Sequence, residues 1–80
     1  MEDMEAYGKR LRAARMRSQG VVIQIVSKNG ELLIAFPTHD GIFRLPPGRD
    51  DLLARIRRSH EMQEKIAFTF DGELTIVSID

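Results

Sequence analysis

The chain has 80 residues, of which 27 are Val, Ile, Leu, Met or Phe, so it is expected to form one domain with a single core. It contains no cysteine, which excludes disulfides, thiolate metal sites and a thiol nucleophile and favours a cytoplasmic location. The formal net charge is zero, which argues against a dedicated nucleic-acid binder, and no apolar run approaches the roughly 20 residues that span a membrane.

A helix is predicted over residues 2–18, because apolar side chains recur there at intervals of three and four residues. These side chains are Met4, Tyr7, Leu11 and Ala14. Acids fill the first turn and arginines lie toward the end, which is the order that the helix dipole favours. Gly20 is expected to stop the helix. The opening acids also differ from the positive start of a secretory signal. We therefore expect an amphipathic helix in residues 1–19 and a separate small domain in residues 20–80.

A β-hairpin is predicted over residues 21–36. The segments VVIQIVSK and ELLIAF are rich in strand-forming residues, and Asn29-Gly30 lies between them. Such a pair suits a two-residue type I′ turn, in which both residues have positive φ. Val22 and Val26 are apolar although they lie opposite the Val21, Ile23 and Ile25 face. The pattern therefore predicts a strand that is covered on both sides or that curls across two sheets.

A third strand and a second helix are predicted in the middle of the chain. Pro37 and PTHDG end the second strand, and GIFRLP forms a short third strand. A helix is then expected over residues 50–62, with Asp50 or Asp51 as its N-cap. Its apolar wedge consists of Leu52, Leu53, Ile56 and His60.

The last part of the chain predicts another hairpin. KIAFTF alternates between inward and outward residues, and Asp71-Gly72 suits a two-residue turn into ELTIVSID. The apolar face of this last strand changes sides, because Leu74 and Ile76 lie on one face and Val77 and Ile79 on the other. A β-bulge near Val77 would produce this change.

The order of the elements predicts an α+β fold. After the first helix, three strands, a helix and two strands follow, which is the order of the OB-fold, a five-stranded partly open barrel. DLLARIRRSHEMQEKIAFTF resembles the helix and fourth strand of OB-fold modules. The predicted fold is therefore a small five-stranded antiparallel barrel with an additional N-terminal helix. A flat antiparallel sheet with both helices on one face and an SH3-like barrel are the alternatives.

No pattern in the sequence points to catalysis or to a metal. The serines lack the G-x-S-x-G elbow, and the glycines do not form a phosphate-binding loop. His39 precedes Asp40, but PTHDG has the composition of a turn. His39 and His60 are far apart in the sequence and neither has a spaced partner ligand. The sequence thus predicts a protein that is not an enzyme and that needs no cofactor or metal.

Binding to a protein partner or to a second copy is the leading functional hypothesis. The helical stripe of Met4, Tyr7, Leu11 and Ala14 is the predicted contact, together with an exposed sheet edge. YGKRLRAARMRSQG resembles the opening helix of the phage-repressor type of helix-turn-helix, but strand residues follow Gly20 where a recognition helix would stand. The resemblance therefore carries no DNA-binding function to this chain.

Weak binding of single-stranded nucleic acid on strands two and three is the alternative hypothesis. Its candidate residues are Lys28, Phe36, Phe43, Arg44 and Arg49. Phe36 shares a face with Leu32 and Ile34, and Phe43 with Leu45, which favours a core position for both rings. A basic surface is also predicted if the two helices are neighbours, and it would be formed by Arg10, Arg12, Arg15, Arg17, Arg55, Arg57 and Arg58.

Overall fold

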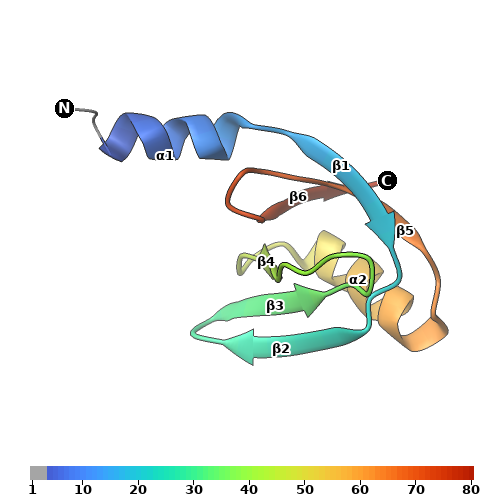
Figure 1. Cartoon of the computed structure of the whole chain (residues 1–80). Helices are drawn as coiled ribbons and strands as arrows, with labels where there is room; N and C mark the ends of the chain where they lie inside the picture. Colours follow the sequence, from blue (N-terminus) through green and yellow to red (C-terminus); the bar gives the residue numbers. More distant parts are fainter. Residues whose placement is uncertain (1–3) are drawn as a thin grey trace.

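The chain forms two antiparallel sheets and two helices (Figure 1). The computed structural model describes the backbone of residues 4–80 and the side chains of residues 9–80. In chain order the elements are α1 (Met4–Ala13), β1 (Met16–Gly20), β2 (Gln24–Lys28), β3 (Glu31–Ala35), β4 (Phe43–Leu45), α2 (Asp50–Met62), β5 (Ile66–Phe70) and β6 (Ile76–Ile79).

The predicted five-stranded barrel is wrong, because six strands form two separate sheets and the described residues form no closed barrel. The first sheet has the strand order β1-β5-β6 and the second has the order β2-β3-β4. The two sheets meet at a single parallel bridge between Arg44 and Thr75, where the Arg44 N–H donates to the Leu74 carbonyl at 2.8 Å. One bridge of this kind does not join the two sheets into one continuous sheet.

The sixth strand comes from residues that were predicted to be helical. α1 ends at Ala13, and Met16–Gly20 pairs along its whole length with β5, from Met16 opposite Phe70 to Gly20 opposite Ile66. β5 is the central strand of its sheet and presents main-chain groups on both sides. A buried main-chain group needs a hydrogen-bond partner, and β1 supplies these partners although its own sequence has little strand character.

The predicted turn at Asn29-Gly30 is confirmed. Lys28 pairs with Glu31, and Asn29 and Gly30 have φ angles of 53° and 82°, as a type I′ turn requires. The predicted bulge is also confirmed, because Thr69 pairs with Ser78 and Phe70 with Ile76, which leaves Val77 as the extra residue.

The two-residue turn predicted at Asp71-Gly72 is wrong. β5 ends at Phe70 and β6 begins at Ile76, so the connection runs through residues 71–75. The Asp71 carboxylate accepts the N–H groups of Glu73 and Thr75 at 2.9 and 3.0 Å, and Leu74 has a φ angle of 62°. These hydrogen bonds hold a longer, ordered loop.

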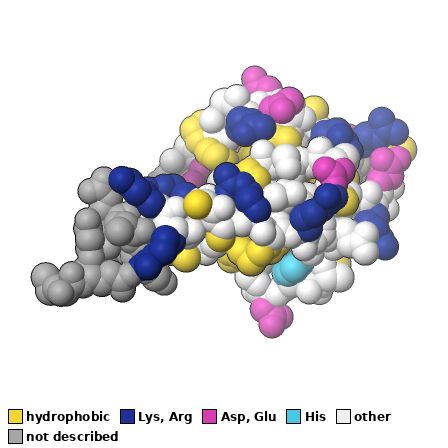
Figure 2. Space-filling view, turned by 90° about the horizontal axis from the view of Figure 1, so that it is seen from above, with side chains coloured by type: hydrophobic (Ala, Val, Ile, Leu, Met, Phe, Trp, Pro, Cys, Tyr) yellow, Lys and Arg dark blue, Asp and Glu magenta, His cyan; other side chains and the backbone are white. Residues whose placement is uncertain are grey.

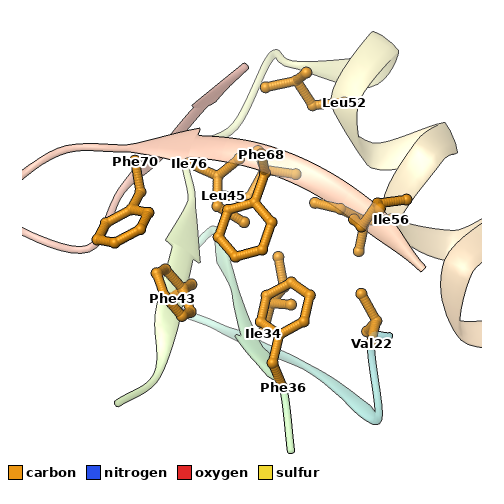
Figure 3. Close-up of a cluster of buried hydrophobic side chains, with 11 residues drawn as sticks. Val22, Ile34, Phe36, Phe43, Leu45, Leu52, Ile56, Phe68, Phe70 and Ile76 are labelled. Atoms are coloured by element: carbon orange, nitrogen blue, oxygen red, sulfur yellow. The ribbon is translucent and has the colours of Figure 1, made fainter. Parts of the chain in front are cut away.

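The core lies between the two sheets and is closed by α2 (Figure 3). Phe36 stacks on Phe68 with ring centroids 4.6 Å apart, and Phe43 meets the edges of Phe68 and Phe70 at 5.2 and 4.9 Å. Phe36 and Phe43 are 2% and 1% exposed, which confirms the core position predicted for both rings. Offset and edge-on contacts of this kind are the favoured arrangements of aromatic rings.

The helix predicted over residues 50–62 is confirmed as α2, but its cap and its buried face differ from the prediction. Arg49 occupies the N-cap position, and Asp50 and Asp51 lie in the first turn. A hydrogen bond from the Arg49 side chain lowers the pKa of Asp51 below its ordinary value. His60, which was predicted to face the core, is exposed, and Ser59 is buried instead.

Ser59 is buried because its hydroxyl joins two parts of the backbone. Its Oγ accepts the Val22 N–H at 3.1 Å and donates to the Glu64 carbonyl at 2.6 Å. Val22 lies in the connection between β1 and β2, and Glu64 precedes β5. The buried hydroxyl thus both donates and accepts a hydrogen bond, and it connects α2 to the segment between β1 and β2 and to the segment that precedes β5.

α1 extends away from the body of the molecule and approaches it at its C-terminal end (Figure 1). There the Gly72 N–H donates to the Leu11 carbonyl at 2.8 Å, and the same carbonyl accepts the Ala14 N–H at 3.3 Å at the end of the helix. A Cβ atom on Gly72 would lie 2.9 Å from Leu11 Cδ2 and 3.0 Å from the Leu11 carbonyl oxygen. Contact at this point therefore requires glycine.

Gly72→Ala is expected to lower the free energy of unfolding by about 1–2 kcal/mol, because the added methyl group forces α1 away from the loop. Urea denaturation measures this loss, and trypsin is expected to cleave faster after Arg12 and Arg15. Glu73→Ala, next in the chain, is the control and should change the stability by less than about 0.5 kcal/mol. Equal stability of Gly72→Ala and the unchanged protein would show that this contact contributes nothing.

Candidate interaction surface

The second sheet presents apolar side chains on its outer face as well as toward the core. Its inner side chains are buried, with Ile34 at 0% and Phe43 at 1% exposure. On the other face Val26 lies beside Leu33 in the register, and one step beyond the Ile34–Phe43 pair places Ile42 beside Ala35. Val26 and Ile42 are 42% and 49% exposed, and both lie on this outer face.

A bulge at the start of β2 adds Ile23 to the same face. The register pairs Gln24 with Ala35, but the Ile23 N–H also donates to the Ala35 carbonyl, at 3.0 Å. Ile23 and Gln24 therefore both lie opposite Ala35, an arrangement that defines a β-bulge. Val22 points into the core at 0% exposure, and Ile23 is 49% exposed. We call Ile23, Val26, Leu33, Ala35 and Ile42 the outer apolar face.

The first sheet is different, because its outer face is polar. Arg17 lies beside Thr69 and Thr69 beside Ser78 in the register. Arg17 also forms an ion pair with Asp80. Figure 2, seen from the side of α1 and β1, shows several Lys and Arg side chains spread over this side of the molecule. The outer face of the second sheet also carries polar residues, namely Gln24, Lys28, Glu31 and Arg44. Its exposed apolar side chains thus form a patch bordered by polar ones, which is a feature that protein domains use for contacts with other molecules.

The outer apolar face borders a free sheet edge on β2. Lys28 and Glu31 flank a two-residue turn and so form a hydrogen-bonded pair, and this pairing alternates along an antiparallel ladder. The main-chain N–H and C=O groups of Ile25 and Ser27 therefore point away from β3. β2 is an edge strand of its sheet, so these main-chain groups lie at an open edge. Such an edge is a template for pairing with another strand.

The structure describes the side chains of only part of the helical stripe that was predicted to contact a partner. The side chains of Met4 and Tyr7 lie outside the described residues. Leu11 is half-buried, with its carbonyl bound to Gly72 in the same chain, and Ala14 is half-buried just beyond the end of α1. Of the described part of the stripe, Leu11 therefore contacts the loop of its own domain.

The residues proposed for nucleic-acid binding do not form a stacking platform. Phe36 and Phe43 are covered by the core, so neither ring presents a face to a base. Arg44 forms an ion pair with Glu31 at 3.3 Å, and Arg49 with Asp51 at 3.5 Å. Lys28 is exposed at the hairpin end of β2.

The predicted basic residues are spread over several elements, because the two helices are not neighbours. α1 and α2 lie at different ends of the molecule (Figure 1). Arg10 and Arg12 lie on α1, Arg15 follows it, and Arg17 lies on β1, while Arg55, Arg57 and Arg58 lie on α2. Asp80 binds both Arg17 and Arg55, and Glu64 binds Arg58 at 3.1 Å. Asp80 therefore brings Arg17 and Arg55 together, whereas Arg58 is paired with a different residue, Glu64.

A contact between Ser18 and His39 was not predicted. Ser18 Oγ lies 2.5 Å from His39 Nε2, and the imidazole meets the edge of Phe43 at 5.1 Å between centroids. A serine–imidazole pair serves catalysis when a third group orients the base, but in residues 9–80 no carboxylate hydrogen-bonds to His39. The two residues are 21 positions apart, so sequence spacing could not have revealed this contact.

Two further features of the described chain bear on function. Within residues 4–80, no helix is long and apolar enough to cross a membrane. The described part of the chain also contains no group of three or more His, Cys, Asp or Glu side chains that could hold a metal ion.

Comparison with known proteins shows the fold and no family. No protein-family model matches this chain, and no curated protein matches it. One solved structure that is similar is a crystal structure of a mutant of pro-protein-glutaminase, with a TM-score of 0.71 and 12% sequence identity. The similarity covers 78% of this chain and 23% of that chain. The chain thus spans less than a quarter of the neighbour's length and shares a small α+β domain with it.

Proposed function

We propose that this chain is a non-catalytic binding module that contacts protein through the β2 edge and the outer apolar face. The observation that carries this proposal is the position of Ile23 and Val26, which are large, apolar and exposed beside the open edge of β2. A strand of a partner protein that pairs with β2 would form main-chain hydrogen bonds with this edge and apolar contacts with the outer apolar face.

The proposed contact surface lies on the second sheet and not on the N-terminal helix. Leu11 contacts the loop of its own domain, whereas Val26 and Ile42 remain 42% and 49% exposed. The neighbouring fold supports a modular role, because in pro-protein-glutaminase a similar unit makes up part of a longer chain. That protein is an enzyme precursor, and the absence of catalysis in this chain is part of our proposal. A cytoplasmic location also stays a prediction.

Position-specific crosslinking tests this function. A photoreactive amino acid at Val26 is expected to form protein adducts in the cells that make this protein, because that position lies inside the proposed contact. The same amino acid at Ser78, on the polar face of the first sheet, is the matched control and should give few adducts. Equal yields at the two positions, or none at Val26, would contradict the proposal.

Salt distinguishes the alternative function in the same experiment. Apolar and main-chain contacts persist when the salt concentration rises, whereas contacts with phosphates weaken steeply. We expect the yield of adducts at Val26 to change less than about twofold between 0.1 and 0.5 M salt, roughly the range over which screening becomes strong. Adducts that contain nucleic acid and disappear with salt would favour the alternative.

A further inference from the structure

We propose that the partner at the β2 edge is a second copy of this chain, paired antiparallel about a two-fold axis that passes beside Val26. This inference rests on the proposed function and adds the identity of the partner. The resulting assembly is a closed dimer in which the second sheets of the two copies form one continuous sheet. Its order is β4-β3-β2 in one protomer followed by the same three strands in reverse in its partner.

The main-chain groups of β2 are complementary to themselves. Ile25 and Ser27 are the strand residues whose N–H and C=O groups point outward. A two-fold axis beside Val26 sets Ile25 opposite the partner's Ser27, and Ser27 opposite the partner's Ile25. Both are then hydrogen-bonded pairs, and each pair exchanges two main-chain hydrogen bonds. In this register the outward groups of Ile25 and Ser27 all find a partner.

The side chains of the outer face also suit this register. Val26 would lie opposite the partner's Val26 in a non-hydrogen-bonded pair, where Cα atoms approach to about 4.5 Å. Two apolar side chains that are 42% exposed in the single chain would then cover each other. Gln24 would lie opposite the partner's Lys28, so no like charges oppose each other across the axis. The net charge of zero means that the two copies do not repel each other as whole molecules.

The fold limits this pairing to two copies. The other edge of the second sheet is occupied, because the β4 residue Arg44 donates to Leu74. On the first sheet, β1 carries Arg17 and follows Arg15, and such charges protect an edge against pairing. The bulge at Ile23 and the turn at Asn29 limit the pairing length on β2. Within the second sheet, the β2 edge is thus the one open to pairing, and it is used once in a closed dimer.

Charge substitutions at Val26 test this arrangement directly. The unchanged protein is expected to show by light scattering a mass twice the 9.1 kDa of one chain. Val26→Lys sets two like charges opposite each other across the axis and should weaken association about tenfold or more. Val26→Glu should do the same for the same reason. A mixture of the two variants should recover the mass of the dimer, because each Lys then meets a Glu of the other chain.

Controls separate this inference from the proposed function. Ser78→Lys adds the same charge to the first sheet and should leave the dimer unchanged, and circular dichroism should show that every variant remains folded. A dimer that resists both Val26 substitutions, or that the mixture fails to restore, would overturn the two-fold pairing. A monomer whose Val26 crosslinks to a different protein would overturn this inference and leave the proposed function standing. A monomer with no adduct at Val26 would overturn both.

Discussion

Replacing Phe68 with alanine is expected to lower the free energy of unfolding by about 3–5 kcal/mol, the cost of removing a buried aromatic side chain. Phe68 is 0% exposed, and its ring touches Phe36 from the second sheet at 4.6 Å and Phe43 at 5.2 Å. The cavity would open between the two sheets, in the core that α2 closes. For a domain of this size, the loss corresponds to a melting temperature lower by about 15 °C or more. Thermal and urea denaturation measure it.

Two control variants show whether the cavity is the cause. Phe68→Leu keeps most of the apolar volume and should cost about 1–1.5 kcal/mol. Met62→Ala removes an apolar side chain that is 63% exposed at the end of α2, and should change the stability by less than about 0.5 kcal/mol. A loss below about 1 kcal/mol for Phe68→Ala would mean that its ring does not join the two sheets.

Elements with strong local signals were predicted correctly. The Asn29-Gly30 turn requires positive φ at both residues, and few other residue pairs adopt this conformation easily. The helix at residues 50–62 has apolar positions spaced by three and four residues, and the strand at residues 66–70 alternates regularly. In each case the information lies within a short segment, so the sequence alone was sufficient.

Elements that depend on distant partners were missed. Met16–Gly20 has the composition of a helix end and becomes a strand because β5 needs a second neighbour. Barrel closure also depends on how far two edges pair, and the sheets meet only at Arg44 and Thr75. Ser59 is buried by its bonds to Val22 and to Glu64, which belong to other segments. No periodicity within the helix distinguishes Ser59 from His60 in this respect.

The sequence carried a signal for the interaction surface, but the interpretation was incomplete. Val22 and Val26 made the first strand of the hairpin apolar on both faces, which predicted a strand that is covered on both sides or that curls across two sheets. The structure buries Val22 and leaves Val26 exposed, because the bulge at Ile23 changes the face on which later residues lie. A strand that is apolar on two faces and lies at a sheet edge therefore has one face available for a partner.

Asp71→Ala is expected to lower the free energy of unfolding by about 2–4 kcal/mol, because it removes the acceptor of two hydrogen bonds to a carboxylate. Asp71 is 5% exposed and holds the N–H groups of Glu73 and Thr75. The loop that it organises forms hydrogen bonds with two other parts of the molecule. Leu74 accepts the Arg44 N–H from the second sheet, and Gly72 donates to Leu11 at the end of α1. Losing this carboxylate should therefore loosen α1 and the bridge between the sheets together.

Asp71→Asn separates the role of the acceptor from that of the charge. An asparagine side-chain oxygen can accept the same two N–H groups, so this variant should lose less than half as much stability as the alanine variant. Hydrogen exchange provides a second measurement, because the Gly72 and Arg44 amides should exchange faster in Asp71→Ala than in Asp71→Asn. If the two variants are equally stable, the loop does not depend on the oxygen at this position. Faster exchange confined to Glu73 and Thr75 would show that the loop, α1 and the sheet bridge open independently.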